Sequence, residues 1–383
     1  MRKPVAFATI AVALVLTLGA CTSPGAGVPG TGTGTPPAGA PAGATGAAGA
    51  TGSPVQPVGT PRVIATGFDV PWSMLRLRSG STLVSERQTA LIKEVRSNGA
   101  VRVVGKVRGV VPNGEGGLLG LATKPGYDGW LYVDLTTAHD NRVVRIRLLG
   151  TAGNYSLGDE ETLITGLPTA GNHDGGRLKF GPDGDLYITA GDATDRERAQ
   201  DLDYLGGKIL RIEPDGSIPP DNPFPNSPVW SYGHRNPQGI AWDDSGRMWA
   251  SEFGQDTWDE LNIITAGKNY GWPIVEGKGT NPRFVNPVLQ WSTADASPSG
   301  LLYTHGTLFL AALRGERLWA IYPTASPVAA VPWFTGEFGR LRDVIDGPAG
   351  TIWILTNNTA RGDPRRGDDQ ILQVRLGAVQ NSG

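Results

Sequence analysis

A short sequence repeat occurs six times along this chain, about once every fifty residues, and it constrains the fold more than any other feature. Each copy joins a glycine-bearing turn to a run of apolar residues with the pattern of a buried β-strand. The turn glycines of the six copies are Gly80, Gly129, Gly184, Gly246, Gly306 and Gly350. The chain is therefore expected to consist of six structural units of similar length.

Units of this length suit the four-stranded blades of a β-propeller and are longer than most solenoid repeats. We therefore expect an all-β fold, a six-bladed β-propeller of four-stranded antiparallel blades, over residues 61–383. A propeller gathers loops at one end of a central channel, so polar residues that follow the repeat strands should converge there. The aromatic residues Trp130, Trp249, Trp319 and Trp353 are expected to lie on repeat strands and to pack between blades.

The N-terminus has the features of an export signal. Two basic residues precede an uncharged apolar run from Val5 to Leu18, which is short for a membrane span of roughly twenty residues. The run ends in a Leu-Gly-Ala-Cys motif at Cys21, which resembles the lipobox of bacterial lipoprotein signals. The resemblance implies that residues 1–20 are removed and that Cys21, the single cysteine, carries a lipid anchor at the outer face of the cytoplasmic membrane.

Residues 21–60 form a second compositional region. After Cys21 it consists almost entirely of Gly, Pro, Ala, Ser and Thr and contains no charged residue. Such a composition cannot bury enough apolar surface to offset the entropy lost on ordering the chain. We expect a flexible tether between the lipidated cysteine and the propeller.

The charge balance argues against a general attraction to polyanions. The chain has 34 Lys and Arg residues against 36 Asp and Glu residues, a formal net charge of −2. No nucleic-acid partner is expected from this balance. Local groups of charged residues must therefore carry any functional argument.

Two loop segments place rare or charged residues beside expected strands. His173 lies in a Gly-rich loop before the third repeat strand, where an imidazole can act as a general base. Asp192 follows that strand, so its carboxylate can approach the imidazole ring and orient it. Arg235 and Asn236 stand side by side before Pro237, and the arginine can bind a carboxylate through two hydrogen bonds.

Two further segments favour binding of a cation and of an anion. Residues 251–262 combine carboxylates, amides and flexible carbonyls, which are the hard oxygen ligands that calcium prefers. Arg340 and Arg342 alternate along an expected strand and so share one face. Two neighbouring cations on one face require an anion.

Four short sequence motifs are characteristic of one protein family. They are Gly-Lys-Ile-Leu-Arg-Ile from Gly207, Gly-His-Arg-Asn-Pro-Gln-Gly from Gly233, Asp-Glu-Leu-Asn from Asp259 and Asn-Tyr-Gly-Trp-Pro from Asn269. The chain resembles the soluble pyrroloquinoline-quinone (PQQ)-dependent glucose and aldose sugar dehydrogenases from about Asp69 to Asn357. The resemblance implies a six-bladed propeller that oxidises an aldose at its anomeric carbon to the lactone, with PQQ and calcium as cofactors and an external electron acceptor.

The resemblance also implies roles for individual residues. His173 matches the catalytic base and Asp192 matches its orienting partner. The positions that contact the cofactor are matched by Glu115, Arg235, Asn236, Arg314, Arg340 and Arg342. The positions that bind metal are matched by Gly254 and Gln255, whose carbonyls would hold an active-site calcium ion, and by Glu260 and Tyr270, which would form a further, structural calcium site.

Three positions depart from the family pattern. Glu115 replaces a glutamine near the cofactor, and its negative charge could repel the quinone or recruit a cation. Arg314 replaces a lysine and keeps the charge without the compact ammonium geometry. Gln255 replaces a proline whose carbonyl is the relevant group.

Two other functions remain open at this point. A noncatalytic cell-surface propeller could bind glycan or protein and keep the motifs for blade structure. Arginines that are scattered or engaged in salt bridges would favour that function. A calcium-dependent propeller hydrolase would instead need a metal held by side-chain carboxylates at the channel mouth.

Overall fold

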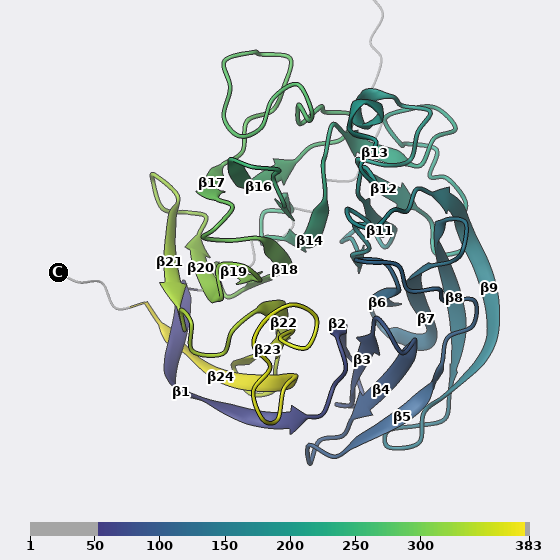
Figure 1. The fold of residues 1–383 in the computed structure, drawn as a ribbon, viewed down its shortest axis with the longest axis vertical. Helices are drawn as coiled ribbons and strands as arrows, with labels where there is room; N and C mark the ends of the chain where they lie inside the picture. The colour runs from purple at the N-terminus through teal and green to yellow at the C-terminus, as the bar shows by residue number, and fades with distance from the viewer. Residues whose placement is uncertain (1–52, 380–383) are drawn as a thin grey trace, which may run out of the picture. The chain divides into compact units, whose positions relative to one another are not determined.

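The computed structural model describes residues 53–379. Within them the chain forms six four-stranded antiparallel sheets arranged in a ring (Figure 1). The expected six-bladed β-propeller is confirmed. One short 3-10 helix, Arg196–Gln200, interrupts the strands, and no helix in the described part of the chain is long and apolar enough to cross a membrane.

The blades follow one another along the chain. Blade 1 contains β2 (Pro71–Arg76), β3 (Thr82–Glu86), β4 (Leu91–Val95) and β5 (Val101–Lys106). Blade 2 contains β6 (Leu118–Lys124), β7 (Tyr127–Thr136), β8 (Asn141–Leu149) and β9 (Ser156–Leu167). Blade 3 contains β10 (Leu178–Phe180), β11 (Leu186–Ala190), β12 (Lys208–Ile212) and β13 (Val229–Tyr232).

The second half of the ring continues in the same order. Blade 4 contains β14 (Pro237–Trp242), β15 (Met248–Glu252), β16 (Trp258–Ile264) and β17 (Leu289–Ser292). Blade 5 contains β18 (Pro298–Thr304), β19 (Thr307–Ala312), β20 (Arg317–Tyr322) and β21 (Ala329–Trp333). Blade 6 contains β22 (Leu341–Asp346), β23 (Thr351–Thr356), β24 (Gln370–Ala378) and, from the other end of the chain, β1 (Val55–Thr66).

The short sequence repeat forms the second strand of every blade: β3, β7, β11, β15, β19 and β23. Every residue of β11, β15 and β23 is buried, as expected for a strand paired on both edges and packed on both faces. Three of the expected tryptophans are buried on repeat strands: Trp130 on β7, Trp249 on β15 and Trp353 on β23. Trp319 is also buried, but it lies on the third strand, β20, and not on a repeat strand.

Blade 6 closes the ring by joining the two ends of the domain. β1 pairs antiparallel with β24, with Val55 opposite Ala378, and forms the outer strand of this blade. Pairing of this kind ties the first and last blades together and removes a free edge. The propeller therefore begins at Val55, earlier than the expected boundary at residue 61, so the last residues assigned to the tether belong to the sheet. The signal segment 1–20 and Cys21 lie outside the described residues.

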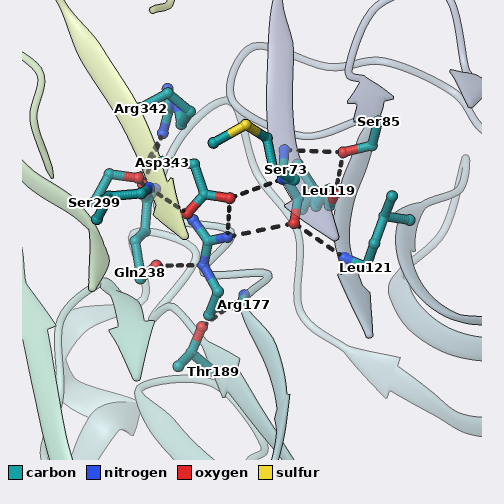
Figure 2. Close-up of polar contacts among 12 residues, drawn as sticks. Ser73, Ser85, Leu119, Leu121, Arg177, Thr189, Gln238, Ser299, Arg342 and Asp343 are labelled. Carbon is teal, nitrogen blue, oxygen red and sulfur yellow. Dashed lines mark hydrogen bonds and ion pairs between the residues drawn. The ribbon is translucent and has the colours of Figure 1, made fainter. Parts of the chain in front are cut away.

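Polar side chains on or directly before the first strands of five blades contact one another (Figure 2). We call this set the polar ring; it consists of Ser73, Arg177, Gln238, Ser299, Arg342 and Asp343, from five of the six blades. At its centre Arg177 forms an ion pair with Asp343 at 3.1 Å, and its Nε donates to the carbonyl of Gln238 at 2.8 Å. The ring joins residues far apart in sequence, so it braces the blades against one another.

The polar ring also separates two cavities. Gln238 and Arg342 line a cavity of about 290 Å³, whereas Ser73, Arg177 and Asp343 line another of about 670 Å³. Trp72 lies beside the ring, with the guanidinium groups of Arg177 and Arg342 at 4.3 and 5.8 Å from its ring centroid. The smaller cavity is the one that collects the residues expected to function.

Candidate active site

The smaller cavity opens where the first strands begin and the second strands end. Arg87, Gly254, Arg314 and Asn357 line it from positions just after second strands, which confirms the expected convergence of residues that follow the repeat strands. Of the residues predicted from the sequence, the following line this cavity: Glu115, His173, Arg235, Asn236, Gly254, Gln255, Arg314, Arg340 and Arg342. Asp192, Glu260 and Tyr270 lie behind its wall.

The imidazole of His173 is paired with Asp192. The His173 Nδ1 and Asp192 Oδ1 atoms are 2.7 Å apart, and the Asp192 side chain is 1% exposed. A carboxylate at Nδ1 favours the tautomer with the proton on that nitrogen, which leaves Nε2 as an acceptor. A side chain of this kind at a cavity wall can accept a proton from a bound ligand.

Asp192 is itself held from several directions. Its Oδ2 accepts the indole N–H of Trp272 at 2.8 Å, and its Oδ1 also accepts the backbone N–H of Thr194 at 2.8 Å. Its backbone N–H donates to the carbonyl of Arg235 at 2.8 Å. The carboxylate therefore has a fixed position from which to orient the imidazole.

The backbone around His173 is strained and closely packed. His173 adopts a φ of 65°, a left-handed conformation that costs a non-glycine residue energy and recurs at functional sites. Its N–H donates to Glu115 Oε2 at 3.0 Å. A Cβ on Gly191 would collide with the His173 carbonyl, so glycine is required where the following loop crosses this residue. The side chain of Glu115 is thus engaged with the loop that carries the base.

Asn236 supports the same loop from the fourth blade. Its Oδ1 accepts the backbone N–H of Gly175 at 3.0 Å, and its side chain is buried. One lining residue therefore fixes the position of another lining segment.

Six arginines and two acidic residues line the cavity: Arg87, Arg235, Arg314, Arg340, Arg342 and Arg361, with Glu115 and Asp259. The closest acid–base pair among them joins Arg361 to Glu115 at 3.9 Å, at the exposed side of the site. In the described part of the chain, Arg87, Arg235, Arg340 and Arg342 form no ion pair, and the Nε of each is buried without a hydrogen-bond partner. Buried cations with free donors form a site for an anion.

Burial lowers the pKa of these four arginines. In Arg342 desolvation is the largest cause, and repulsion from Arg87 and Arg340 adds to it. Its two terminal nitrogens are fixed by Gln238 Oε1 at 2.8 Å and Asn357 Oδ1 at 3.2 Å. The protein holds this charge in place at an electrostatic cost that a bound anion would relieve.

The residues matched to calcium sites fall into two places. Gly254 and Gln255 line the cavity, so their carbonyls are available beside the arginines. Glu260 and Tyr270 line a small neighbouring space of about 10 Å³, together with Glu252 and Glu276, and this space shares Arg235 and Gly254 with the cavity. Burial raises the pKa of Glu260 to about 8, and the neighbouring Glu252 adds to this effect.

The volume of this small space and the charges around it suit a single bound cation. It has about the volume of one water molecule, and the crowded glutamates would be relieved by a positive charge. The hydroxyl of Tyr270 already donates to the carbonyl of Ile263 at 2.7 Å, so its phenol is occupied. Within residues 53–379 no three His, Cys, Asp or Glu side chains converge at metal-binding distance, so backbone oxygens must supply part of any coordination.

The sequence analysis missed several lining residues. Arg87 directly follows the first repeat strand, β3, so the rule that located the other loops would also have found it. Asp259 accepts the N–H of Gly254 at 2.9 Å, and burial raises its pKa to about 6. Arg361 comes from the loop between β23 and β24, for which no repeat or motif gave a signal.

Comparisons with known proteins agree with this geometry. The model of the glucose/sorbosone dehydrogenase family matches residues 68–363. The chain belongs to this family. It is 30% identical to aldose sugar dehydrogenase YliI of Escherichia coli K12 over 338 residues, which cover 78% of this chain and 90% of that protein.

Two further relatives carry the quinone cofactor in their names. Quinoprotein glucose dehydrogenase B of Acinetobacter calcoaceticus is 32% identical over 251 residues, which cover 56% of the present chain and 52% of the Acinetobacter protein. The PQQ-bound structure of an aldose sugar dehydrogenase from Streptomyces coelicolor is similar with a TM-score of 0.80 and 48% identity, and covers 85% of this chain and 99% of that chain. These relatives support an oxidoreductase of the PQQ type.

Proposed function

We propose that this protein oxidises an aldose sugar at its anomeric carbon to the lactone, with PQQ as the electron acceptor in the site. The observation that carries the proposal is the His173–Asp192 pair in the wall of a cavity with six lining arginines. A general base beside an anion-binding surface is what this reaction requires. The aldose and glucose dehydrogenases among the relatives support the same substrate class.

The cavity residues fit the quinone. PQQ carries three carboxylates, and the lining arginines Arg87, Arg235, Arg340 and Arg342, which have no acidic partner within the described chain, suit such groups. Arg314 and Asn236 complete the contacts inferred from the family resemblance. Glu115 Oε2 accepts the backbone N–H of His173, and this contact to the His173 loop supports a role in shaping the site.

When bound, the quinone supplies a hydride acceptor. His173 Nε2 takes the proton from the anomeric hydroxyl while the hydride leaves the same carbon, so the C–O bond becomes a carbonyl and the product is the lactone. Asp192 stabilises the imidazolium that forms, through the 2.7 Å contact to Nδ1. Repeated turnover would require an external electron acceptor.

Calcium is proposed at two positions. The carbonyls of Gly254 and Gln255 would hold one ion at the cavity, where a divalent cation polarises bound oxygens. Glu260 and the main chain around Tyr270 would hold a second, structural ion in the small space. The glutamate side chains around that space support this assignment.

The arrangement of charge does not favour the other functions considered. A binding module would leave the arginines scattered or paired, yet six of them line one cavity and just one lies within 4.0 Å of an acid there. A hydrolase would need a metal held by side-chain carboxylates at the channel mouth, whereas the cavity has two acidic residues among six arginines.

We also propose that the protein is exported and anchored by lipid on Cys21 at the outer face of the cytoplasmic membrane. The lipobox resemblance supports this location, and sugar and acceptor would meet the propeller outside the cytoplasm.

The proposed function is tested by titrating purified protein with PQQ in the presence of calcium. Absorbance reports quinone binding, and dye-coupled oxidation of a panel of aldoses reports turnover. We expect saturable binding and oxidation of at least one aldose, with both weakened after calcium is removed by a chelator. A protein that does not bind the quinone in calcium would overturn the proposal.

A further inference from the structure

One carboxylate oxygen organises the loop that borders the cavity after β15. Glu276 Oε1 accepts the backbone N–H groups of four consecutive residues, Gln255, Asp256, Thr257 and Trp258, at 2.7, 3.1, 3.1 and 3.2 Å. Residues 255–257 are exposed, and their N–H groups make no other hydrogen bond within the described chain. Successive N–H groups that converge on one point form a concave anion site, which here is filled by the protein's own side chain.

This pattern fixes the direction of two carbonyls. In a planar trans peptide, the C=O of one residue and the N–H of the next point in opposite directions. The peptides that follow Gly254 and Gln255 are trans, and their N–H groups point to Glu276. The carbonyls of Gly254 and Gln255 therefore point away from Glu276, and both residues line the cavity.

The base of the loop is held as tightly as its tip. The N–H of Gly254 donates to Asp259 Oδ1 at 2.9 Å, and a Cβ at Gly254 would collide with the Trp258 carbonyl. Asp259 and Glu276 thus hold the N–H groups of residues 254–258 on one side. Residues 253–257 lie between β15 and β16, and these two carboxylates order them outside the strand ladder.

We propose that Glu276 is a positioning residue that holds the Gly254 and Gln255 carbonyls toward the cavity and thereby sets the calcium affinity of the site. The inference rests on the proposed function for the identity of the ion, because carbonyl oxygens are calcium ligands. The Oε1 atom of Glu276 is engaged by the four N–H groups of the loop, and its side chain also lines the small space proposed for the second ion. It acts through the main chain of the loop.

The test compares wild type with Glu276→Gln, Glu276→Asp and Glu276→Ala, and with Glu160→Gln as a control on an exposed glutamate of β9. Amide hydrogen exchange of residues 253–259 in the metal-free protein reports the loop directly. Calorimetric titration with calcium alone, and with calcium plus PQQ, reports affinity, and Glu260→Gln, a change confined to the small space, distinguishes the ion proposed there from the ion at the cavity. Thermal unfolding identifies any variant that fails to fold, and Glu276→Gln, which is nearly isosteric, is the decisive variant.

We expect faster exchange at residues 255–258 and a calcium affinity at least about tenfold weaker in Glu276→Gln, equivalent to about 1.4 kcal/mol, with Glu276→Ala more affected and Glu160→Gln unchanged. Unchanged exchange, or faster exchange with unchanged calcium affinity, would overturn the inference. If wild type binds calcium and not PQQ, the proposed function fails while the calcium titrations still decide the role of Glu276. If wild type binds no calcium, this inference fails.

Discussion

At the scale of single residues, His173 shows how the site is built. Its ring is fixed by Asp192, its backbone N–H by Glu115, and its strained φ of 65° is accommodated because Gly191 leaves room for its carbonyl. The proposed base is therefore positioned by three separate segments of the chain. Such over-determination keeps a strained conformation populated.

Substitution of the proposed base should abolish turnover without preventing cofactor binding. His173→Ala is expected to lower kcat by roughly 10²- to 10⁴-fold, because it removes the proposed general base. Asp192→Asn should act in the same direction but less, since it weakens the hold on the imidazole. Steady-state kinetics and quinone titration measure the two effects. Near wild-type turnover in His173→Ala would remove this residue from the mechanism.

Loss of the buried Arg342 should weaken quinone binding. Arg342→Ala removes a charge-assisted hydrogen bond worth on the order of 1.5 to 3 kcal/mol, or about 10- to 150-fold in affinity. Arg342→Lys should recover part of the loss, because a lysine cannot reproduce the planar contacts to Gln238 and Asn357. Equilibrium titration with PQQ is the measurement, with Arg62→Ala, an exposed arginine on β1, as the control. Full recovery in the lysine variant would indicate a diffuse electrostatic role.

Asp174 should make stability depend on pH. Burial raises its pKa to about 6 from the usual 3.8, although Thr169 and Asn141 donate hydrogen bonds to it. Because the folded carboxyl holds its proton to higher pH than the unfolded one, its stabilising contribution is complete below about pH 4 and is lost as the pH rises through about 6.

Replacement of this carboxyl should remove that dependence. Asp174→Asn is expected to gain up to about 3 kcal/mol in free energy of unfolding over wild type at pH 7.5, and little at pH 4. Urea unfolding across this range measures the difference, and Asp203→Asn on an exposed residue is the control. A difference that does not vary with pH would contradict the assignment.

At the scale of elements, the second strands set the architecture and the loops beside them carry the site. The strand β1 shows that an element outside the repeats can be equally structural. Val55 at its start exchanges two hydrogen bonds of 2.9 Å with the Thr307 hydroxyl, so the outer strand of blade 6 is also joined to blade 5.

A variant that begins at residue 53 should unfold at the wild-type temperature, whereas one that begins at residue 61 should unfold at a lower temperature. The second truncation removes the pairs from Val55–Ala378 to Val58–Arg375 and the contacts to Thr307. Each kcal/mol lost would lower Tm by roughly 2 to 4 °C. Calorimetry of the two variants is the measurement. Equal melting temperatures would show that this part of β1 contributes nothing to closure.

At the scale of the whole molecule, the anchor is the feature that the sequence alone supports. Cys21→Ser should release the protein into the medium or leave the signal uncleaved, because lipid attachment requires the thiol. Fractionation and immunoblotting of cells that express each form measure this. A processed Cys21→Ser protein that stays bound to membranes would contradict the anchor, and Ser23→Ala serves as a neighbouring control.

The sequence by itself determined the number of blades, because the second strands bury both faces and so repeat a local apolar pattern that can be counted. It also pointed to His173, Asp192 and the arginine pair, because these lie beside repeat strands or in stretches shared with a family. Arg87 could have been predicted in the same way, because it directly follows the repeat strand β3.

The tertiary structure alone decided the contacts between segments that are distant in the sequence. Glu276 binds residues about twenty positions away, Trp272 reaches Asp192 across 80 positions, and Arg177 meets Ser73 across 104. No periodicity or spacing encodes such pairs, since they depend on how blades close around a common axis. The strand that begins at Val55 could not be assigned to blade 6 from its amino-acid composition, because its partner strand, β24, is at the other end of the chain.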